Sequence, residues 1–146
     1  MSAAPWLSTA GVVQRSNTAE PSHSRSYDAH FGGHGKPTID VLLHSVAIPS
    51  GCANDTLSFY RNVDTTEGGS AAVDTLTVQV LNSSGTVLAT LTTLSNTSRA
   101  AGYQQPMFNL SAFAGQMVRI RFRGSETDSA GGTTNFVIDD TALNVS

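Results

Sequence analysis

The sequence predicts an all-β protein, an antiparallel β-sandwich formed by a single domain over residues 1–146. Three observations indicate this class. Apolar and polar residues alternate with period 2 over many segments, as in strands that bury one face. Clusters of Gly, Asn, Ser and Pro separate these segments at strand-length intervals. Helical periodicity is almost absent, and 146 residues are enough for one core without disulfides.

The clearest element is a hairpin. From Asp74 to Leu81 apolar residues alternate with Thr and Gln, Asn82–Gly85 carries turn residues, and the alternation resumes at Val87. Another strand alternates apolar residues with arginines between Val118 and Arg123. We expect seven to nine strands in total, and the others are Ser26–Phe31, Thr38–Ile48, Thr56–Val63 and a last strand from Phe136 to Val145.

The rest of the chain is less regular. In the first 24 residues only Gly11–Arg15 resembles a strand. The segment Leu110–Gly115 predicts the only helical turn, with Ser111 as its cap and Gly115 in the positive φ that ends it. The shared alternation predicts a core that includes Leu57, Phe59, Leu76, Val78, Val80, Val118, Ile120, Phe122, Phe136 and Ile138.

Composition excludes several function classes. Charged residues make up 13% of the chain, the net charge is −3 and there is a single lysine, so we expect no nucleic-acid partner. No apolar run approaches the length of a membrane helix, so we expect no membrane insertion. Cys52 is the only cysteine, which leaves a half-buried thiol or an intermolecular disulfide. Met1–Trp6 lacks the features of a secretory signal, so we expect a mature fragment.

Six segments in a fixed order resemble a known group of domains. They are Val46–Pro49, Thr56–Tyr60, Thr65–Glu67, Asp74–Val78, Leu110–Gln116 and Phe136–Asp140. Together they are similar to the MAM-like, galactose-binding-like jelly rolls that follow catalytic domains in secreted bacterial peptidases of the sedolisin and kumamolisin type. The similarity covers Pro5 to Val145. It implies a jelly-roll sandwich, a secreted location and a non-catalytic accessory role.

Two departures from that group affect what the resemblance implies. The group opens with a strand that carries a Phe-Glu pair before Pro-Trp, and here Pro5-Trp6 stands almost at the start of the sequence. Where the group commonly has Gln, this chain has His44.

The resemblance also implies a structural calcium site at Asp139 and Asp140. In related jelly rolls an aspartate at this position helps to hold Ca²⁺, with carbonyls that would come here from Pro21–Ser26. Adjacent carboxylates on a strand point to opposite faces, so only one of the pair can face such a site, and we favour Asp139. The alternative is an exposed or hydrogen-bonded pair at a strand end.

Arginines are the candidate ligand-binding residues. Arg119, Arg121 and Arg123 share one face of a strand and offer planar guanidinium forks to an anionic glycan or a carboxylate-rich partner. The alternative is cross-strand pairing with Asp and Glu. Arg61 continues the apolar face of Leu57 and Phe59, which places it at a sheet margin, in a pair with Glu67, or in a ligand-binding cleft.

The sequence gives little support for a catalytic site or a zinc site. His23, His30 and His34 with Asp28 match no established zinc spacing, and exposed histidines are the commoner account. No Gly-X-Ser-X-Gly motif is present, and no residue is placed to lower the pKa of Cys52. We therefore expect no enzyme activity from this domain.

The function that follows is an accessory module of a secreted bacterial hydrolase, a peptidase by the resemblance. Such a module binds a polysaccharide or a protein surface, and carbohydrate is the ligand class that the resemblance favours. The alternative is a self-associating structural subunit, completed by strand addition from a neighbouring molecule.

Overall fold

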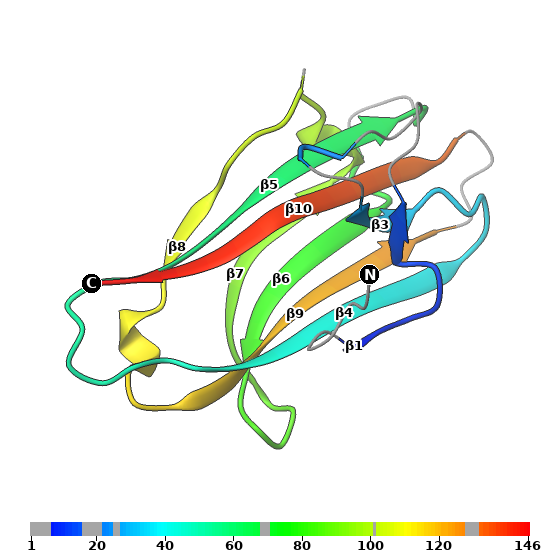
Figure 1. Ribbon diagram of the computed structural model, residues 1–146. Helices are drawn as coiled ribbons and strands as arrows, with labels where there is room; N and C mark the ends of the chain where they lie inside the picture. The colour runs from blue at the N-terminus through cyan, green and yellow to red at the C-terminus, as the bar shows by residue number, and fades with distance from the viewer. Residues whose placement is uncertain (1–6, 16–21, 25–26, 68–70, 101, 128–131) are drawn as a thin grey trace.

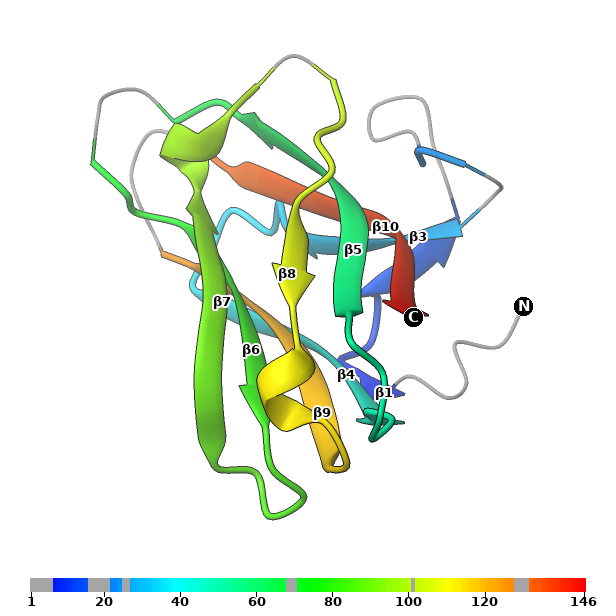
Figure 2. The same cartoon turned by 90° about the vertical axis from the view of Figure 1, so that its left-hand side faces the viewer.

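Two five-stranded antiparallel sheets packed face to face form the molecule (Figure 1). The structure is a computed structural model that describes residues 7–15, 22–24, 27–67, 71–100, 102–127 and 132–146. Sheet A has the strand order β1-β4-β9-β6-β7, and sheet B has the order β2-β3-β10-β5-β8. Figure 2 shows the two layers from the side on which β7 and β8 lie.

Sheet A is centred on β9, which pairs with β4 on one side and β6 on the other. The hairpin of β6 and β7 closes through a turn in which the Asn82 side chain accepts the backbone N–H of Ser84 and Thr86, and Gly85 takes a φ of +91°. The strands of this sheet are β1 (Leu7–Ser8), β4 (Thr38–Ala47), β6 (Thr75–Leu81), β7 (Val87–Ser95) and β9 (Met117–Glu126).

Sheet B is centred on β10, which pairs with β5 along one edge and with β3 along part of the other. A register shift interrupts the β5 pairing between Asp139 and Ala142, and Asp140 there has a φ of +49°. The strands are β2 (Val13–Arg15), β3 (Tyr27–Gly32), β5 (Asp55–Thr65), β8 (Met107–Asn109) and β10 (Thr134–Val145).

The predicted core is confirmed. All ten predicted residues are buried, and the rings of Phe59 from sheet B and Phe122 from sheet A meet edge to face, 5.2 Å apart. Inward-facing residues of both sheets alternate with outward-facing ones, so the same period of 2 that predicts the strands also assigns each strand two faces.

Several local expectations need correction. The structure has ten strands, because the short edge strands β1 and β8 add to those expected. A 3₁₀ turn, η1 (Asn96–Ser98), was not anticipated. The second turn, η2 (Ser111–Phe113), begins after Leu110 without a side-chain cap, and the Ser111 hydroxyl instead accepts the backbone N–H of Asp55. Gly115 does take a positive φ, +79°.

Both helical segments that the structure describes are three-residue 3₁₀ turns, so none of the described helices has the length or apolar character to cross a membrane.

Candidate functional site

The outward-facing side chains of sheet A form one of two candidate surfaces. On β9 the buried residues Val118, Ile120 and Phe122 alternate with the half-buried Arg119, Arg121 and Arg123. The arginines therefore point away from the core, in a row along the central strand of the sheet. We call them the arginine row. The structure confirms the shared face that the sequence predicts for them.

Arg121 is held in place by a neighbouring strand. Its Nη2 donates to Oε1 of Gln79 on β6 at 2.5 Å, and its Nε is buried without a partner among the described residues. The register places Leu43 on the other side of Arg121, on β4. Sequence reasoning missed the role of Gln79, although its outward position in the hairpin strand was predicted.

The described strands place no carboxylate across from the arginine row. The cross-strand neighbours of the three arginines are Leu, Val, Ser, Thr and Gln residues of β4 and β6. The acidic residues in the strands of sheet A are Asp40 and Glu126, and both are 4% exposed. Cross-strand ion pairs, the alternative account of the arginines, are thus not observed among the described residues of this face.

Asp40 and Glu126 act on the inner side, where they hold the glycine-rich loop between β3 and β4. Glu126 accepts the backbone N–H of His34 and Gly35 at 2.7 and 3.0 Å, and Asp40 accepts that of Gly32 at 2.9 Å. The His34 ring also bonds to Asp40, at 2.9 Å. Sheet A therefore uses the carboxylates of its strands internally, and the charged residues that its strands present on the outer face are the three arginines.

Arg61 lies apart from the arginine row, on β5 of sheet B. Its Nη1 donates to the Ser98 carbonyl at 2.9 Å, and burial lowers the pKa of the guanidinium. This contact ties η1 to the sheet. The four arginines predicted as ligand-binding residues therefore do not converge on one site.

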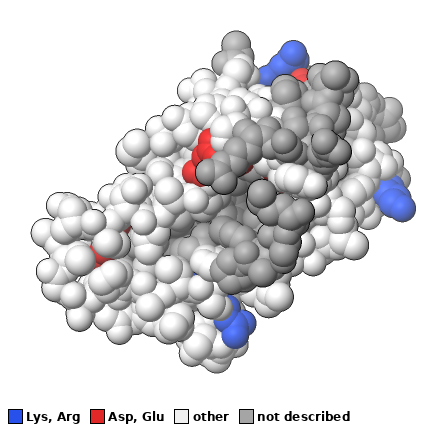
Figure 3. Space-filling model, in the orientation of Figure 1, with Lys and Arg blue, Asp and Glu red and all other residues white. Residues whose placement is uncertain are grey.

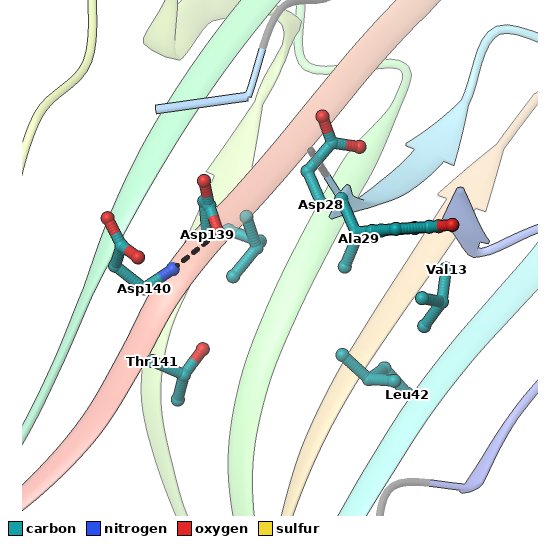
Figure 4. A pocket seen from close by; sticks show the side chains of 9 residues that line it. Val13, Asp28, Ala29, Leu42, Asp139, Asp140 and Thr141 are labelled. Atoms are coloured by element: carbon teal, nitrogen blue, oxygen red, sulfur yellow. Dashed lines mark hydrogen bonds between the residues drawn. The ribbon is translucent and has the colours of Figure 1, made fainter. Parts of the chain in front are cut away.

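A pocket at the edge of the sandwich, between β4 of sheet A and β3 and β10 of sheet B, is the second candidate surface. Its volume is about 240 Å³, and it is lined by Val13, Tyr27, Asp28, Ala29, Leu42, Ile138, Asp139, Asp140 and Thr141. Figure 4 shows the carboxylates of Asp28, Asp139 and Asp140 above an apolar floor. On the face of the molecule drawn in Figure 3, acidic atoms gather near the middle, and basic atoms lie at the margins.

Asp28 is the unusual residue of this pocket. It is 5% exposed, and neither carboxylate oxygen has a hydrogen-bond partner among the described residues. The register that pairs Ala29 with Ile138 places Asp28 beside Asp139 on the next strand. Burial raises the pKa of Asp28 from 3.8 to about 6; His30 lowers it in part, and Asp139 raises it. Sequence reasoning considered Asp28 only as a zinc ligand and gave no sign of its burial.

Asp139 and Asp140 do not point to opposite faces as strict alternation predicts. Asp139 Oδ2 accepts the backbone N–H of Ser24 at 2.9 Å, and Asp140 Oδ1 accepts the Ser24 hydroxyl at 2.6 Å. Asp140 also meets the His23 ring at 2.7 Å, and that ring stacks on Tyr60. The positive φ of Asp140 breaks the alternation, so both carboxylates turn toward the same segment.

The fit of this cluster to calcium is partial. Asp28 and Asp139 supply neighbouring carboxylates, and the unpaired oxygens of a buried carboxylate favour a cation. No group of three or more Asp, Glu, His or Cys suitable for a metal is found among the described residues. The remaining oxygens that calcium needs would come from carbonyls and water. Half of the predicted carbonyl segment, Pro21–Ser26, lies outside the described residues; Ser24 directs an N–H at Asp139.

A second hollow lies between the sheets, beside the edge pocket. It measures about 200 Å³ and is lined by His44, Val46, Leu57, Leu110, Ile120, Thr141 and Leu143. Thr141 belongs to both hollows, so the opening continues along β10. His44 thus faces the interior.

Comparisons with solved structures decide the fold type. TmCBM61 in complex with β-1,4-galactotriose is similar with a TM-score of 0.67 at 16% identity, over 98% of this chain and 90% of that one. The fold is a jelly-roll β-sandwich. A family 16 carbohydrate-binding module has a TM-score of 0.54 at 12% identity, over 95% and 89% of the two chains. An arabinose-bound α-L-arabinofuranosidase has a TM-score of 0.52 at 15% identity, over 97% of this chain and 23% of that one.

The jelly-roll fold is thus confirmed, and identities this low show the fold alone. No protein-family model and no curated protein matches the sequence. The matches do not connect the chain to peptidase accessory domains, so that part of the predicted relationship stays a prediction.

Proposed function

We propose that this protein is a non-catalytic carbohydrate-binding domain that acts as an accessory module. The observation that carries the proposal is the outer face of sheet A, whose described side chains offer guanidinium, amide and hydroxyl groups. Such groups bind the hydroxyls and carboxylates of sugars directly. Similar jelly rolls that include carbohydrate-binding modules support the same ligand class.

The absence of catalysis is part of the proposal. His30 bonds to Asn135 and His34 to Asp40, while Cys52 lies half-buried between β4 and β5. The hydrogen bonds of His23, His30 and His34 go to carboxylate and amide groups, and not to the hydroxyl or thiol nucleophile that acyl-transfer chemistry requires. These side chains therefore stabilise loops and strand ends.

The small share of a larger enzyme that this sandwich matches supports a role as a module attached to a secreted hydrolase. The matched part of the arabinofuranosidase is only 23% of that chain, so this sandwich can stand beside a catalytic domain. The peptidase parent and the secreted location rest on the sequence resemblance alone.

A structural calcium ion is a further part of the proposal. Asp28 and Asp139 are the residues that would hold it, and its role would be to neutralise two neighbouring carboxylates and thereby fix β3 against β10.

The test of the function is binding without turnover. Affinity electrophoresis of the purified domain through gels that contain soluble galactan, xylan or polygalacturonate should show retardation in at least one of them. Assays for released reducing ends, esters and peptides should stay at background. Retardation in none of the gels would contradict the proposal, and so would turnover that disappears when His30, His44 or Cys52 is replaced by Ala in a folded variant.

A second candidate function, self-association through strand addition, is favoured by the pairing of β10. One edge of β10 pairs with β5 as far as Val145, but the other edge pairs with β3 only over Asn135–Ile138. Within the described residues the second half of this strand has a free edge, to which a strand of another molecule can add. Light scattering after size exclusion separates the two: a monomer supports the binding module, and a concentration-dependent dimer supports assembly.

A further inference from the structure

We infer that the arginine row binds an acidic polysaccharide, one that carries a carboxylate on each sugar, as polyuronates do. This inference rests on the proposed function and names the ligand class of the same surface. Arg119, Arg121 and Arg123 would each bind carboxylates of an extended chain that lies along β9 on the outer face of sheet A.

Charge is distributed unevenly in this molecule. The chain has eight Lys and Arg against eleven Asp and Glu, yet the three arginines of the row share a face with no acidic neighbour across the strands. Asp40 and Glu126, the acidic residues of the sheet's strands, are buried and hydrogen-bonded to the glycine-rich loop. An uncompensated cationic row on an acidic protein favours a polyanionic ligand.

Among the residues that the structure describes, the outer face of sheet A also has no aromatic platform. Phe122 is the only Phe, Tyr or Trp in the strands of this sheet, and it is fully buried. Neutral sugars depend on aromatic rings for much of their affinity, because the apolar face of the pyranose packs on them. Here the energy has to come from hydrogen bonds to the guanidinium groups, which are stronger when a carboxylate accepts them than when a neutral hydroxyl does.

The spacing of the row suits a linear polymer. Alternate residues of a strand lie about 6.7 Å apart, so the three arginines repeat at a regular interval along the line of β9. Gln79 fixes the fork of Arg121 in the middle of that line. Leu43 and Val41 flank Arg121 and Arg123 from β4 and can contact the C–H groups of a sugar ring, while Thr77 offers a hydroxyl from β6.

The experiment compares five polymers and four proteins. Isothermal titration measures the affinity for polygalacturonate, for its fully methyl-esterified form and for neutral β-1,4-galactan, with xylan and poly-glutamate as further controls. The proteins are the native domain, Arg121→Gln, the triple variant Arg119→Gln/Arg121→Gln/Arg123→Gln, and Arg99→Gln as the control. Arg99 is exposed next to η1, away from the row. Thermal unfolding verifies that each variant is folded.

We expect the native domain to bind polygalacturonate, and to bind it more weakly as salt increases. Methyl-esterification of the polymer should abolish binding. The affinity for polygalacturonate should fall about tenfold in Arg121→Gln and about a hundredfold or more in the triple variant. Arg99→Gln should leave it unchanged.

Three results would overturn the inference. Equal affinity for galactan and polygalacturonate that survives the triple substitution would refute acidic specificity but keep the carbohydrate-binding function. Binding to none of the polymers, nor to xylan, would refute the function as well. Binding of poly-glutamate as tight as that of polygalacturonate would show a general cationic patch with no glycan specificity.

Discussion

The arginine row and the Asp28–Asp139 pair both place like charges on neighbouring positions of a sheet, but they differ in their contact with water. The arginines are half-buried and stand on an outer face, whereas Asp28 is 5% exposed and neither of its oxygens has a partner among the described residues. In water the repulsion of like charges is screened, and burial removes that screening. The arginine row is therefore suited to a ligand and lowers the free energy of unfolding little. The aspartate pair needs a proton or a cation to be stable.

The largest expected effect on stability comes from comparing substitutions on the buried face and on the outer face of β9. Phe122→Ala should lower the free energy of unfolding by about 3–5 kcal/mol, because it leaves a cavity between the sheets where the ring meets Phe59. Arg121→Gln, one residue earlier on the outer face, should change it by less than about 0.5 kcal/mol. Urea denaturation measures both. A loss above 2 kcal/mol for Arg121→Gln would mean that the arginine row is structural.

Calcium should act on the aspartate pair and leave the arginine row unaffected. An ion that binds only the folded state adds about 3 kcal/mol when its concentration is a hundredfold above Kd. Removal of calcium with a chelator should therefore lower the melting temperature by several degrees, and Asp28→Asn or Asp139→Asn should abolish this response. The Arg119→Gln variant is the matched control and should keep it. Identical melting curves with calcium and with chelator would refute the site.

In the presence of chelator the same pair should make stability depend on pH. Asp28 has a pKa of about 6 in the folded protein and 3.8 as its ordinary value, so between these values the folded state binds more protons than the unfolded state. Stability should therefore fall as pH rises from about 4 to about 6, by about 2–3 kcal/mol, and then level off. Asp28→Asn should flatten this part of the profile and stabilise the protein at neutral pH. A native profile that rises over the same interval would contradict the burial of an ionisable Asp28.

The smallest effect concerns the arginine row itself. Replacing all three arginines by Gln should raise the melting temperature slightly at low salt, because mutual repulsion disappears, and the difference should vanish at high salt. The expected change is a few tenths of a kcal/mol. A marked loss of stability in the triple variant would show that the arginines hold the sheet together and would weaken the contrast with the aspartate pair.

The strands and core were predictable because period 2 records which face of a strand is buried. Leu76, Val78 and Val80 follow it without exception. The same rule failed at Asp139 and Asp140, because a register shift with a positive φ has no signal in an Asp-Asp dipeptide. It also could not find β1 and β8, which at two and three residues are too short to show alternation.

The candidate surfaces were predictable to different degrees. The shared face of Arg119, Arg121 and Arg123 follows from alternation within one strand. The burial of Asp28 does not follow from alternation. It depends on the pairing of β3 with β10 and on the contact of Ser24 with β10, and both bring together residues more than 100 positions apart. Long-range pairing of this kind leaves no local pattern.

The central place of β10 in sheet B has a consequence for how the chain acquires its structure. This strand is the last of the sandwich, yet it separates β3 from β5 and pairs with both. During synthesis β3 and β5 emerge long before their shared partner, and sheet B cannot close until β10 has left the ribosome. Folding should therefore be dominated by late, non-local closure and be slow for a domain of this size. Until then, the edges of β3 and β5 are exposed to pairing with other chains.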